Sequence, residues 1–161
     1  MVFLAKTENN KKVCVKFDHQ YLMEAHLICA SMGFALVLEG FKHVAGGWHM
    51  IVMDAITDRL SHVDKPSVSL YKPIKEKVDQ WVYVHGDLCD INLIVRDDGA
   101  PEMMLFDFDW VREIGKGRYP MNVNRGPNLK RPDGVYDGEL ITAEHDLEML
   151  DIMFKAVLSS T

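Results

Sequence analysis

Residues 84–92 read VHGDLCDIN and residues 105–109 read LFDFD, and these two stretches decide the fold. The first stretch holds three polar residues in the pattern H-x-D-x-x-x-x-N, namely His85, Asp87 and Asn92. The second holds Asp107, twenty residues beyond Asp87. Between them, LIV (93–95) and MMLF (103–106) flank RDDGAPE, which predicts a short β-hairpin. The spacing therefore links a polar loop to a further aspartate across one hairpin.

This arrangement resembles the H-R-D-x-x-x-x-N and D-F-G motifs of the protein-kinase-like superfamily. The resemblance implies phosphoryl transfer, in which a protein mainly positions the reactants and neutralises charge. Asp87 would orient or deprotonate the acceptor hydroxyl. Asn92 and Asp107 would hold Mg²⁺, which prefers oxygen ligands such as an amide carbonyl and a carboxylate. The alternative is that these are ordinary turn-forming residues.

Upstream, VCVKF (13–17) resembles the V-A-I-K strand of kinases. The resemblance implies that Lys16 reaches the α- and β-phosphates of ATP and that Cys14, on the same strand face, lines the adenine pocket. Glu24, in the helix motif MEAH, is the expected ion-pair partner of Lys16. The alternatives are a solvated strand lysine and an exposed helix glutamate.

The run MIVMDAI (50–56) resembles the last strand before the kinase hinge. Met53 would then be the gatekeeper, and the backbones of Asp54 and Ile56 would meet the adenine edge. A core strand that runs into a loop is equally consistent with these residues.

Taken together with GKGRYPMN (115–122) and the late EHD motif, the pattern resembles the fungal-type protein kinase-like family, which is related to aminoglycoside and choline phosphotransferases. The likeness extends from about Val13 to Phe154. It implies that Asp146, in the EHD motif, braces the catalytic loop from below; an exposed acidic residue in a first helical turn is the alternative.

Two departures from the family weaken the prediction of an active enzyme. No glycine precedes Gly33, so the Gly-rich loop and the strand before it are absent, and the chain is expected to begin at the family's second strand. Cys89 stands where protein kinases have a lysine.

Two functions are the main candidates: a kinase-like protein that binds Mg-ATP and transfers the γ-phosphate to a small-molecule or protein hydroxyl, and a catalytically inactive pseudokinase that serves as a protein-interaction module. A metal-dependent hydrolase is a third alternative, with carboxylates from Asp87, Asp107 and Asp109.

The expected fold class is α+β, a truncated protein-kinase-like fold in which a small antiparallel sheet and one helix precede a reduced helical C-terminal lobe. We expect one domain over 1–161 with sub-lobes of about 1–56 and 57–161. Four strands are predicted before the middle of the chain, at 2–7, 12–17, 36–44 and 48–54. Without the preceding strand, residues 2–7 form an exposed sheet edge, which we expect to pair with a second copy or a partner chain, or to be masked by polar residues.

Apolar spacing predicts three helices. The first runs from about Asp18, as its cap, to Met32, with Leu22, Ala25, Cys29 and Met32 on one stripe and Gly33 as its stop. The second spans Ser69 to Trp81, and the third follows Thr142 as its N-cap. Residues 115–138, rich in glycine and proline, are predicted to be mostly loop.

Composition limits the class of protein. The chain has 161 residues, of which 48% are hydrophobic and 26% charged, typical of one globular domain. Its three cysteines form no disulfide or zinc pattern, and no secretory or membrane-spanning segment is evident, so a cytoplasmic location without membrane contact is expected. The net charge of -6 disfavours broad nucleic-acid binding. Residues 112–131 nevertheless carry six basic side chains and one acidic one, a segment that could attract a phosphate-bearing ligand.

Overall fold

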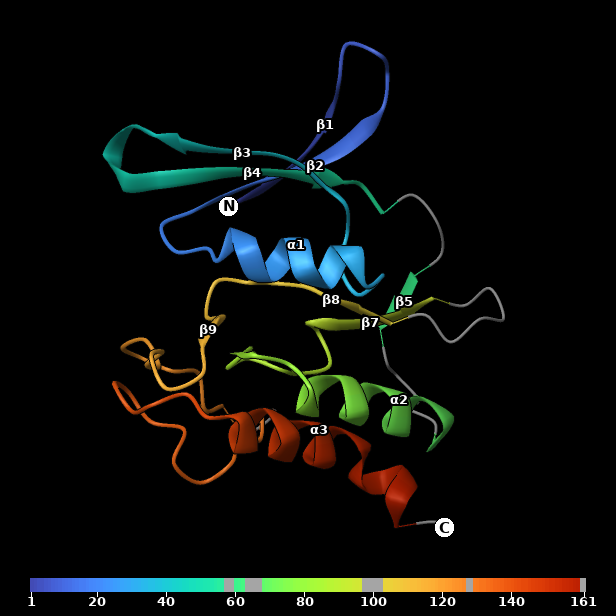
Figure 1. Cartoon of the computed structure of the whole chain (residues 1–161), viewed down its shortest axis with the longest axis vertical. Helices are drawn as coiled ribbons and strands as arrows, with labels where there is room; N and C mark the ends of the chain where they lie inside the picture. The colour runs from blue at the N-terminus through green and yellow to red at the C-terminus, as the bar shows by residue number, and fades with distance from the viewer. Residues whose placement is uncertain (57–59, 63–67, 97–102, 127–128, 160–161) are drawn as a thin grey trace.

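The upper half of the protein is a four-stranded antiparallel sheet (Figure 1). The computed structural model describes residues 1–56, 60–62, 68–96, 103–126 and 129–159. The sheet has the order β1-β2-β4-β3. Its strands are β1 (Val2–Lys6), β2 (Lys12–Asp18), β3 (Leu38–Val44) and β4 (Trp48–Asp54). All four lie where the sequence predicts strands, and a single turn of 3-10 helix, η1 (Ala45–Gly47), joins β3 to β4.

The register of the sheet sets the direction of Lys16. In the β2–β4 pair, Cys14 lies opposite Met53 and Lys16 lies opposite Ile51. Residues directly opposite in an antiparallel pair share a face, so these four side chains lie on one side of the sheet. Ile51 is completely buried and Lys16 is 9% exposed. The strand therefore carries the lysine into the interior rather than into solvent.

Helix α1 (Met23–Ser31) lies under this sheet and is shorter than predicted (Figure 1). Asp18 ends β2, and its carboxylate accepts hydrogen bonds from the backbone N–H groups of His19 and Gln20, so it starts a turn and does not cap the helix. Ala25 and Cys29 are buried as expected, but Met32 is 51% exposed. The helix ends at Ser31, and Gly33 follows its C-cap Met32 with a φ of +76°, a conformation that favours glycine.

The lower half contains two helices and two small sheets. The helices are α2 (Val68–Asp79) and α3 (Ala143–Leu158), close to the predicted positions, and they lie side by side (Figure 1). The predicted hairpin forms β7 (Leu93–Arg96) and β8 (Met103–Leu105), joined by β5 (Leu60–His62) into a sheet of order β5-β7-β8. The second sheet pairs β6 (Tyr83–Val84) with β9 (Arg112–Glu113). The sequence analysis predicted neither β5, β6 nor β9, and most of the RDDGAPE turn, 97–102, lies outside the described residues.

Helix α3 begins as predicted, because the Thr142 hydroxyl accepts a hydrogen bond from the backbone N–H of His145 at 3.3 Å. Residues 115–138 are mostly loop in the part that the structure describes, and Arg118 forms an isolated β-bridge to Leu140.

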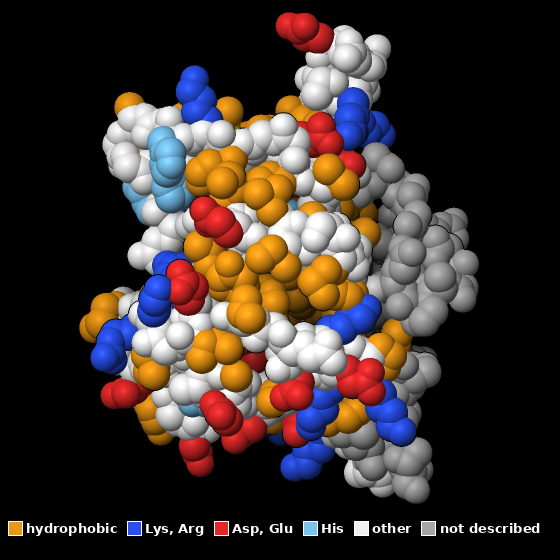
Figure 2. Space-filling model, viewed as in Figure 1, with side chains coloured by type: hydrophobic (Ala, Val, Ile, Leu, Met, Phe, Trp, Pro, Cys, Tyr) orange, Lys and Arg blue, Asp and Glu red, His pale blue; other side chains and the backbone are white. Residues whose placement is uncertain are grey.

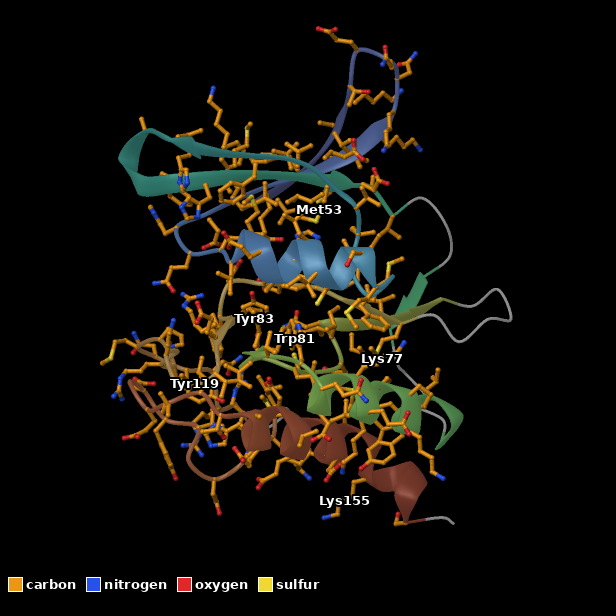
Figure 3. The ribbon with its side chains drawn as sticks, viewed as in Figure 1. Met53, Lys77, Trp81, Tyr83, Tyr119 and Lys155 are labelled. Carbon is orange, nitrogen blue, oxygen red and sulfur yellow. The ribbon has the colours of Figure 1, made fainter. Side chains whose placement is uncertain are left out.

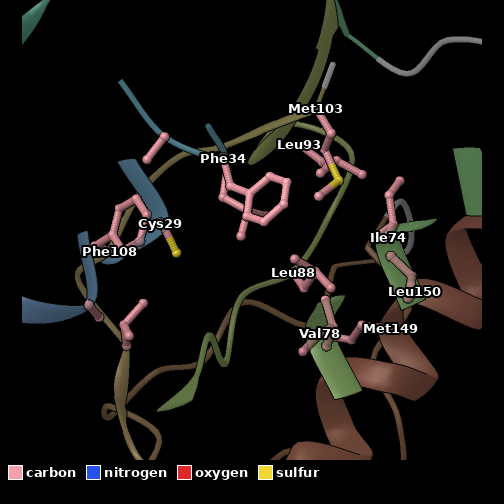
Figure 4. Packing of buried hydrophobic residues seen from close by; sticks show 14 of the residues in the cluster. Cys29, Phe34, Ile74, Val78, Leu88, Leu93, Met103, Phe108, Met149 and Leu150 are labelled. Atoms are coloured by element: carbon pink, nitrogen blue, oxygen red, sulfur yellow. The ribbon is translucent and has the colours of Figure 1, made fainter. Parts of the chain in front are cut away.

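One hydrophobic cluster joins α1 to the lower half (Figure 4). It contains Ala25 and Cys29 from α1, residues from α2, α3, β7 and β8, and Phe108. Full burial of a Leu or Phe side chain stabilises a fold by about 1.5–3 kcal/mol. A smaller cluster of Leu36, Ile51 and Met53 lies under the four-stranded sheet. The main core thus crosses the expected boundary between sub-lobes 1–56 and 57–161.

Strand β1 exposes hydrophobic side chains at the edge of the upper sheet. Among the described residues it pairs with β2 alone, and its Val2, Phe3 and Leu4 are 61%, 48% and 73% exposed. Hydrophobic side chains also gather across the middle of the face shown in Figure 2, where α1 lies, and Leu27 and Ile28 of that helix are exposed. Among the described residues, no helix is both long enough and apolar enough to cross a membrane.

Candidate functional site

The loop 84–92 is held from below by helix α3. The carboxylate of Asp146 accepts hydrogen bonds from the backbone N–H groups of His85, at 2.5 Å, and Gly86, at 2.8 Å. Asp146 is 1% exposed, and its burial raises the pKa of its carboxyl group, which the two backbone N–H donors oppose. Asp146 therefore occupies the bracing position that the resemblance implied, and it is not an exposed first-turn residue.

His85 connects this loop to the second motif. Its Nε2 donates to the carbonyl of Phe106 at 2.9 Å, and its Nδ1 accepts from the backbone N–H of Asp87 at 3.3 Å. The backbone N–H of Phe106 in turn donates to the carbonyl of Asn92 at 2.9 Å. These bonds fix the two motifs against each other at the base of the β7–β8 hairpin.

Both oxygens of the Asp87 carboxylate are hydrogen-bonded. Asn92 Nδ2 donates to Oδ2 at 2.9 Å, and Arg131 Nη2 donates to Oδ1 at 2.6 Å. The Asp87 side chain is still 20% exposed. Asp87 and Asn92 therefore come together as the motif spacing predicts, and Arg131 joins them from a distant loop.

Lys16 reaches across from the upper sheet to the second motif. Its Nζ lies 2.6 Å from Asp107 Oδ1 and 2.5 Å from Asp109 Oδ1. Asp107 has a φ of +62°, a conformation that costs a residue other than glycine about 1–3 kcal/mol. The double contact with Lys16 is one interaction that offsets this cost.

Burial and mutual charge shift the pKa values of this group in different directions. Burial lowers the pKa of Lys16, but the charges of Asp109 and Asp107 raise it by more, so its net pKa lies above the ordinary value. For Asp109, burial and the hydrogen bond with Asp107 raise the pKa to about 8, although Lys16 opposes the shift. For Asp107, burial opposes the shift, but the hydrogen bond with Asp109 and the charge of Lys16 lower the pKa below its ordinary value. Lys16 is therefore charged at neutral pH, and Asp107 is the more acidic of the two carboxyl groups.

The prediction of an ion pair between Lys16 and Glu24 is wrong. Glu24 is exposed, and both carboxylate partners of Lys16 among the described residues lie in the 107–109 stretch. The buried positions of α1 are Ala25, His26 and Cys29, and Glu24 falls on the other face of the helix with Leu27 and Ile28. Asp109 supplies the second carboxylate that we had expected from the helix.

Met53 lies between the four-stranded sheet and α1 (Figure 3), and its role as a gatekeeper stays a prediction. It lines a cavity next to Lys16 together with His26, Leu36 and Phe108. The cavity has a volume of about 20 Å³, enough for about one water molecule, whereas small-molecule pockets have about 300–1,000 Å³. The protein's own side chains therefore fill the space behind Lys16.

Three further residues were expected to contact ATP: Cys14 on β2, Asp54 at the end of β4, and Ile56 just after it. Cys14 is half-buried beside the Leu36, Ile51 and Met53 cluster, and burial raises the pKa of its thiol. The backbone N–H of Asp54 donates to the Val37 carbonyl at 3.0 Å, so that group is not free for a ligand. Ile56 is 40% exposed at the end of a described range. The contacts of these three residues with ATP stay predictions.

The donor set suits Mg²⁺ that arrives with phosphate. Asn92 uses its amide nitrogen on Asp87, so its Oδ1 remains the acceptor, and the Asp107 side chain is 43% exposed. Within the described ranges, no three His, Cys, Asp or Glu side chains converge to hold a metal ion. Mg²⁺ commonly binds through one or two carboxylates together with substrate phosphates, so the residues fit an ion shared with ATP.

Sequence reasoning missed two residues of the site. Asp109 was considered as the residue that replaces glycine in the metal motif and as a carboxylate of the alternative hydrolase, but not as a partner of Lys16. Arg131 was counted only as one charge of the basic segment 112–131. Arg131 is 44 residues from Asp87 along the chain, and no spacing rule joins them. The concentration of positive charge in 112–131 was the one signal that pointed to this segment.

The sequence matches no family model, and no curated protein matches it. Among solved structures, the fold is similar to that of the Cydia pomonella granulovirus kinase PK-1, with a TM-score of 0.71 and 16% sequence identity. The match covers 99% of this chain, which spans 64% of the length of that kinase. At this identity the likeness shows the fold alone, and that fold is kinase-like.

Proposed function

We propose that the protein binds Mg-ATP between the four-stranded sheet and the β7–β8 hairpin and transfers the γ-phosphate to a hydroxyl acceptor. The observation that carries the proposal is the contact of Lys16 with Asp107, at 2.6 Å, which joins residues 91 positions apart beside the Asp87–Asn92 loop. A lysine from the sheet, a carboxylate and an amide oxygen are the groups that phosphate and its metal require. We also propose that the chain belongs to the fungal-type protein kinase-like family.

Each residue has a defined part in this function. Lys16 exchanges its Asp109 contact for phosphate oxygens, while Asp107 and Asn92 are the residues that would hold Mg²⁺. The ion, when bound, neutralises charge on the phosphates. Asp87 accepts the proton of the acceptor hydroxyl, for which it retains free lone pairs because each carboxylate oxygen can accept more than one hydrogen bond. The acceptor is a small molecule or a protein.

A thermal-shift assay with Mg-ATP tests the proposal. Mg-ATP should raise the Tm of the wild type, and Asp107→Asn should abolish that rise because it removes a metal ligand and a partner of Lys16. Asp79→Asn, at an exposed position of α2, is the matched control and should keep the rise. Asp87→Ala should keep the rise while phosphate release falls by about 10²–10⁴-fold. Absence of any rise in the wild type at millimolar Mg-ATP would overturn nucleotide binding.

The second candidate is a catalytically inactive module that engages a protein partner. Two observations favour it: the cavity behind Lys16 holds only about 20 Å³, and Lys16 already has two carboxylate partners. In that case the Lys16 cluster is structural, and the exposed edge of β1 or the basic segment 112–131 serves for interaction. In that case Mg-ATP would not change the Tm of the wild type, and Lys16→Met would lower the Tm equally with and without Mg-ATP.

A further inference from the structure

We propose that Arg131 is a positioning residue for Asp87, which fixes the carboxylate in the orientation that receives the acceptor hydroxyl. This inference rests on the proposed function. It concerns the acceptor side of the site, whereas Lys16 and Asp107 serve the nucleotide side.

The first argument is the geometry at Asp87. Arg131 Nη2 binds Oδ1 at 2.6 Å and Asn92 Nδ2 binds Oδ2 at 2.9 Å, so each oxygen is held by a different segment. A carboxylate bonded on one oxygen alone can rotate about that bond, and the second contact prevents this rotation. The remaining lone pairs then point in a fixed direction.

The second argument is how firmly Arg131 itself is held. Its side chain is only 2% exposed. Nε donates to the Asn124 carbonyl at 2.8 Å, Nη1 contacts Met149 Sδ at 3.6 Å, and the guanidinium carbon lies 5.2 Å from the centre of the Trp110 ring. Each of these contacts comes from a part of the chain remote from Asp87 in sequence, so Arg131 is built into the lower half and is not a surface side chain that happens to touch Asp87.

Arg131 also provides the positive charge that pairs with the Asp87 carboxylate. Among the described residues, Arg131 makes the ion pair with Asp87, and the loop's own position 89 is a cysteine. Burial and the charge of Asp87 raise the pKa of the Cys89 thiol to about 11, so this side chain is uncharged at neutral pH. Arg112 instead binds the backbone carbonyls of Asp109 and Val111.

The burial of the pair indicates a lasting contact and not a latch that opens. Removing one partner of a buried ion pair leaves an uncompensated charge, which is strongly unfavourable. Opening the contact would expose Arg131 to the same penalty while its three other contacts hold it in place. We therefore expect loss of Arg131 to slow phosphoryl transfer, whereas removal of an inhibitory latch would accelerate it.

Steady-state hydrolysis of Mg-ATP, with water as the acceptor, tests the inference. Arg131→Met should lower kcat at least tenfold and leave the KM for Mg-ATP and the Mg-ATP-dependent rise in Tm unchanged. Arg131→Lys keeps the charge and should restore part of the lost kcat. Arg125→Met removes an exposed arginine of the same segment that stacks on Tyr136, and it is the matched control, with wild-type kcat. An unchanged or raised kcat in Arg131→Met, or a KM that rises in step with the loss, would overturn the inference.

A double-mutant cycle in Tm tests the contact without any activity. Asp87→Asn and Arg131→Met should each lower the Tm, and the double variant should lose clearly less than the two separate losses combined, because both substitutions break the same contact. Additive losses would overturn the inference. If Arg131→Met does not fold, Arg131→Gln, which also removes the positive charge, takes its place in the cycle. The cycle remains informative if the wild type binds no Mg-ATP, so failure of the proposed function and failure of this inference can be told apart.

Discussion

Lys16 illustrates how one side chain finds a different partner from the one that its motif suggests. The strand position was predictable, because VCVKF places Lys16 on the face of β2 that turns inward. Its partner depends on which face of α1 turns inward, and that face carries His26 in place of a carboxylate. A buried ammonium group requires a counter-charge, and Asp107 and Asp109 provide it.

His26 gives a prediction about pH. Its Nε2 donates to the Leu36 carbonyl at 2.7 Å, its Nδ1 accepts from the Tyr21 hydroxyl, and its ring stacks on Phe108 with centroids 4.7 Å apart. Burial lowers the pKa of His26 below its ordinary value of 6.5, although the Leu36 carbonyl opposes the shift. As the pH falls, the His26 imidazole therefore becomes protonated at a higher pH in the unfolded chain than in the folded protein. The contribution of His26 to stability is complete above the unfolded pKa and is lost as the pH falls from there toward the folded pKa.

The measurement is the change in Tm between about pH 7.5 and about pH 5.5, a range that spans the ordinary histidine pKa. The wild type should lose stability on acidification, and His26→Gln should lose less, because it has no proton to take up at this site. His43→Gln, at an exposed position, should behave as the wild type does. Equal acid losses in His26→Gln and the wild type would assign the pH dependence to other groups.

At the scale of secondary-structure elements, the sequence predicts those with a strong apolar period. The strands of the upper sheet, α2 and α3 lie within a few residues of the predicted positions. The prediction of α1 began too early, because Asp18 followed by apolar spacing is also typical of a strand end and a turn. Strands β6 and β9 are two residues long and pair positions 28 and 30 residues apart, so neither carries a periodic signal of its own.

The same limit applied to the site. Asp87, Asn92 and Asp107 were predictable because a fixed motif spacing joins them, and Asp146 because a second motif follows. The contacts of Arg131 and Asp109 depend on how a long loop and the upper sheet fold against that motif. Such contacts follow from tertiary packing, which local spacing does not encode.

Asp146 carries a prediction about α3 as an element. Its carboxylate satisfies two backbone N–H groups of the 84–92 loop, so Asp146→Ala should leave both donors buried without a partner. An unsatisfied buried donor costs about 1–3 kcal/mol, and we expect a loss of free energy of unfolding of about that size or larger. Urea denaturation measures it. Glu148→Gln, two residues away at an exposed position, should change the stability by less than about 0.5 kcal/mol. A loss no larger than that of the control would show that α3 does not hold the loop through this carboxylate.

At the scale of the whole molecule, the open edge of the upper sheet is the feature that governs association. Strand β1 pairs with β2 on one side, and Leu4, at 73% exposed, is among its most accessible hydrophobic residues. Edge strands of this kind pair readily with another strand unless charge or a covering segment prevents it. Pairing with a second copy through this edge remains a prediction from the sequence.

Sedimentation velocity at increasing protein concentration checks that prediction. The wild type should shift toward a dimer, and Leu4→Lys should stay monomeric over the same range because a charge on an edge strand opposes pairing. Leu27→Lys, on the exposed face of α1, controls for a general effect of added charge and should dimerise as the wild type does. Dimerisation that survives Leu4→Lys but not Leu27→Lys would move the interface from β1 to α1.

The shared core of α1 and the lower half has a mechanical consequence. Because Ala25 and Cys29 are packed into the same cluster as α2 and α3, the helix is tied to the lower body although it precedes β3 and β4 in the chain. The sheet packs on the lower half through the smaller cluster of Leu36, Ile51 and Met53. Any rotation of the four-stranded sheet relative to the lower half would therefore have its hinge between the sheet and α1. The Lys16 side chain crosses this boundary, so its contacts would change with such a rotation.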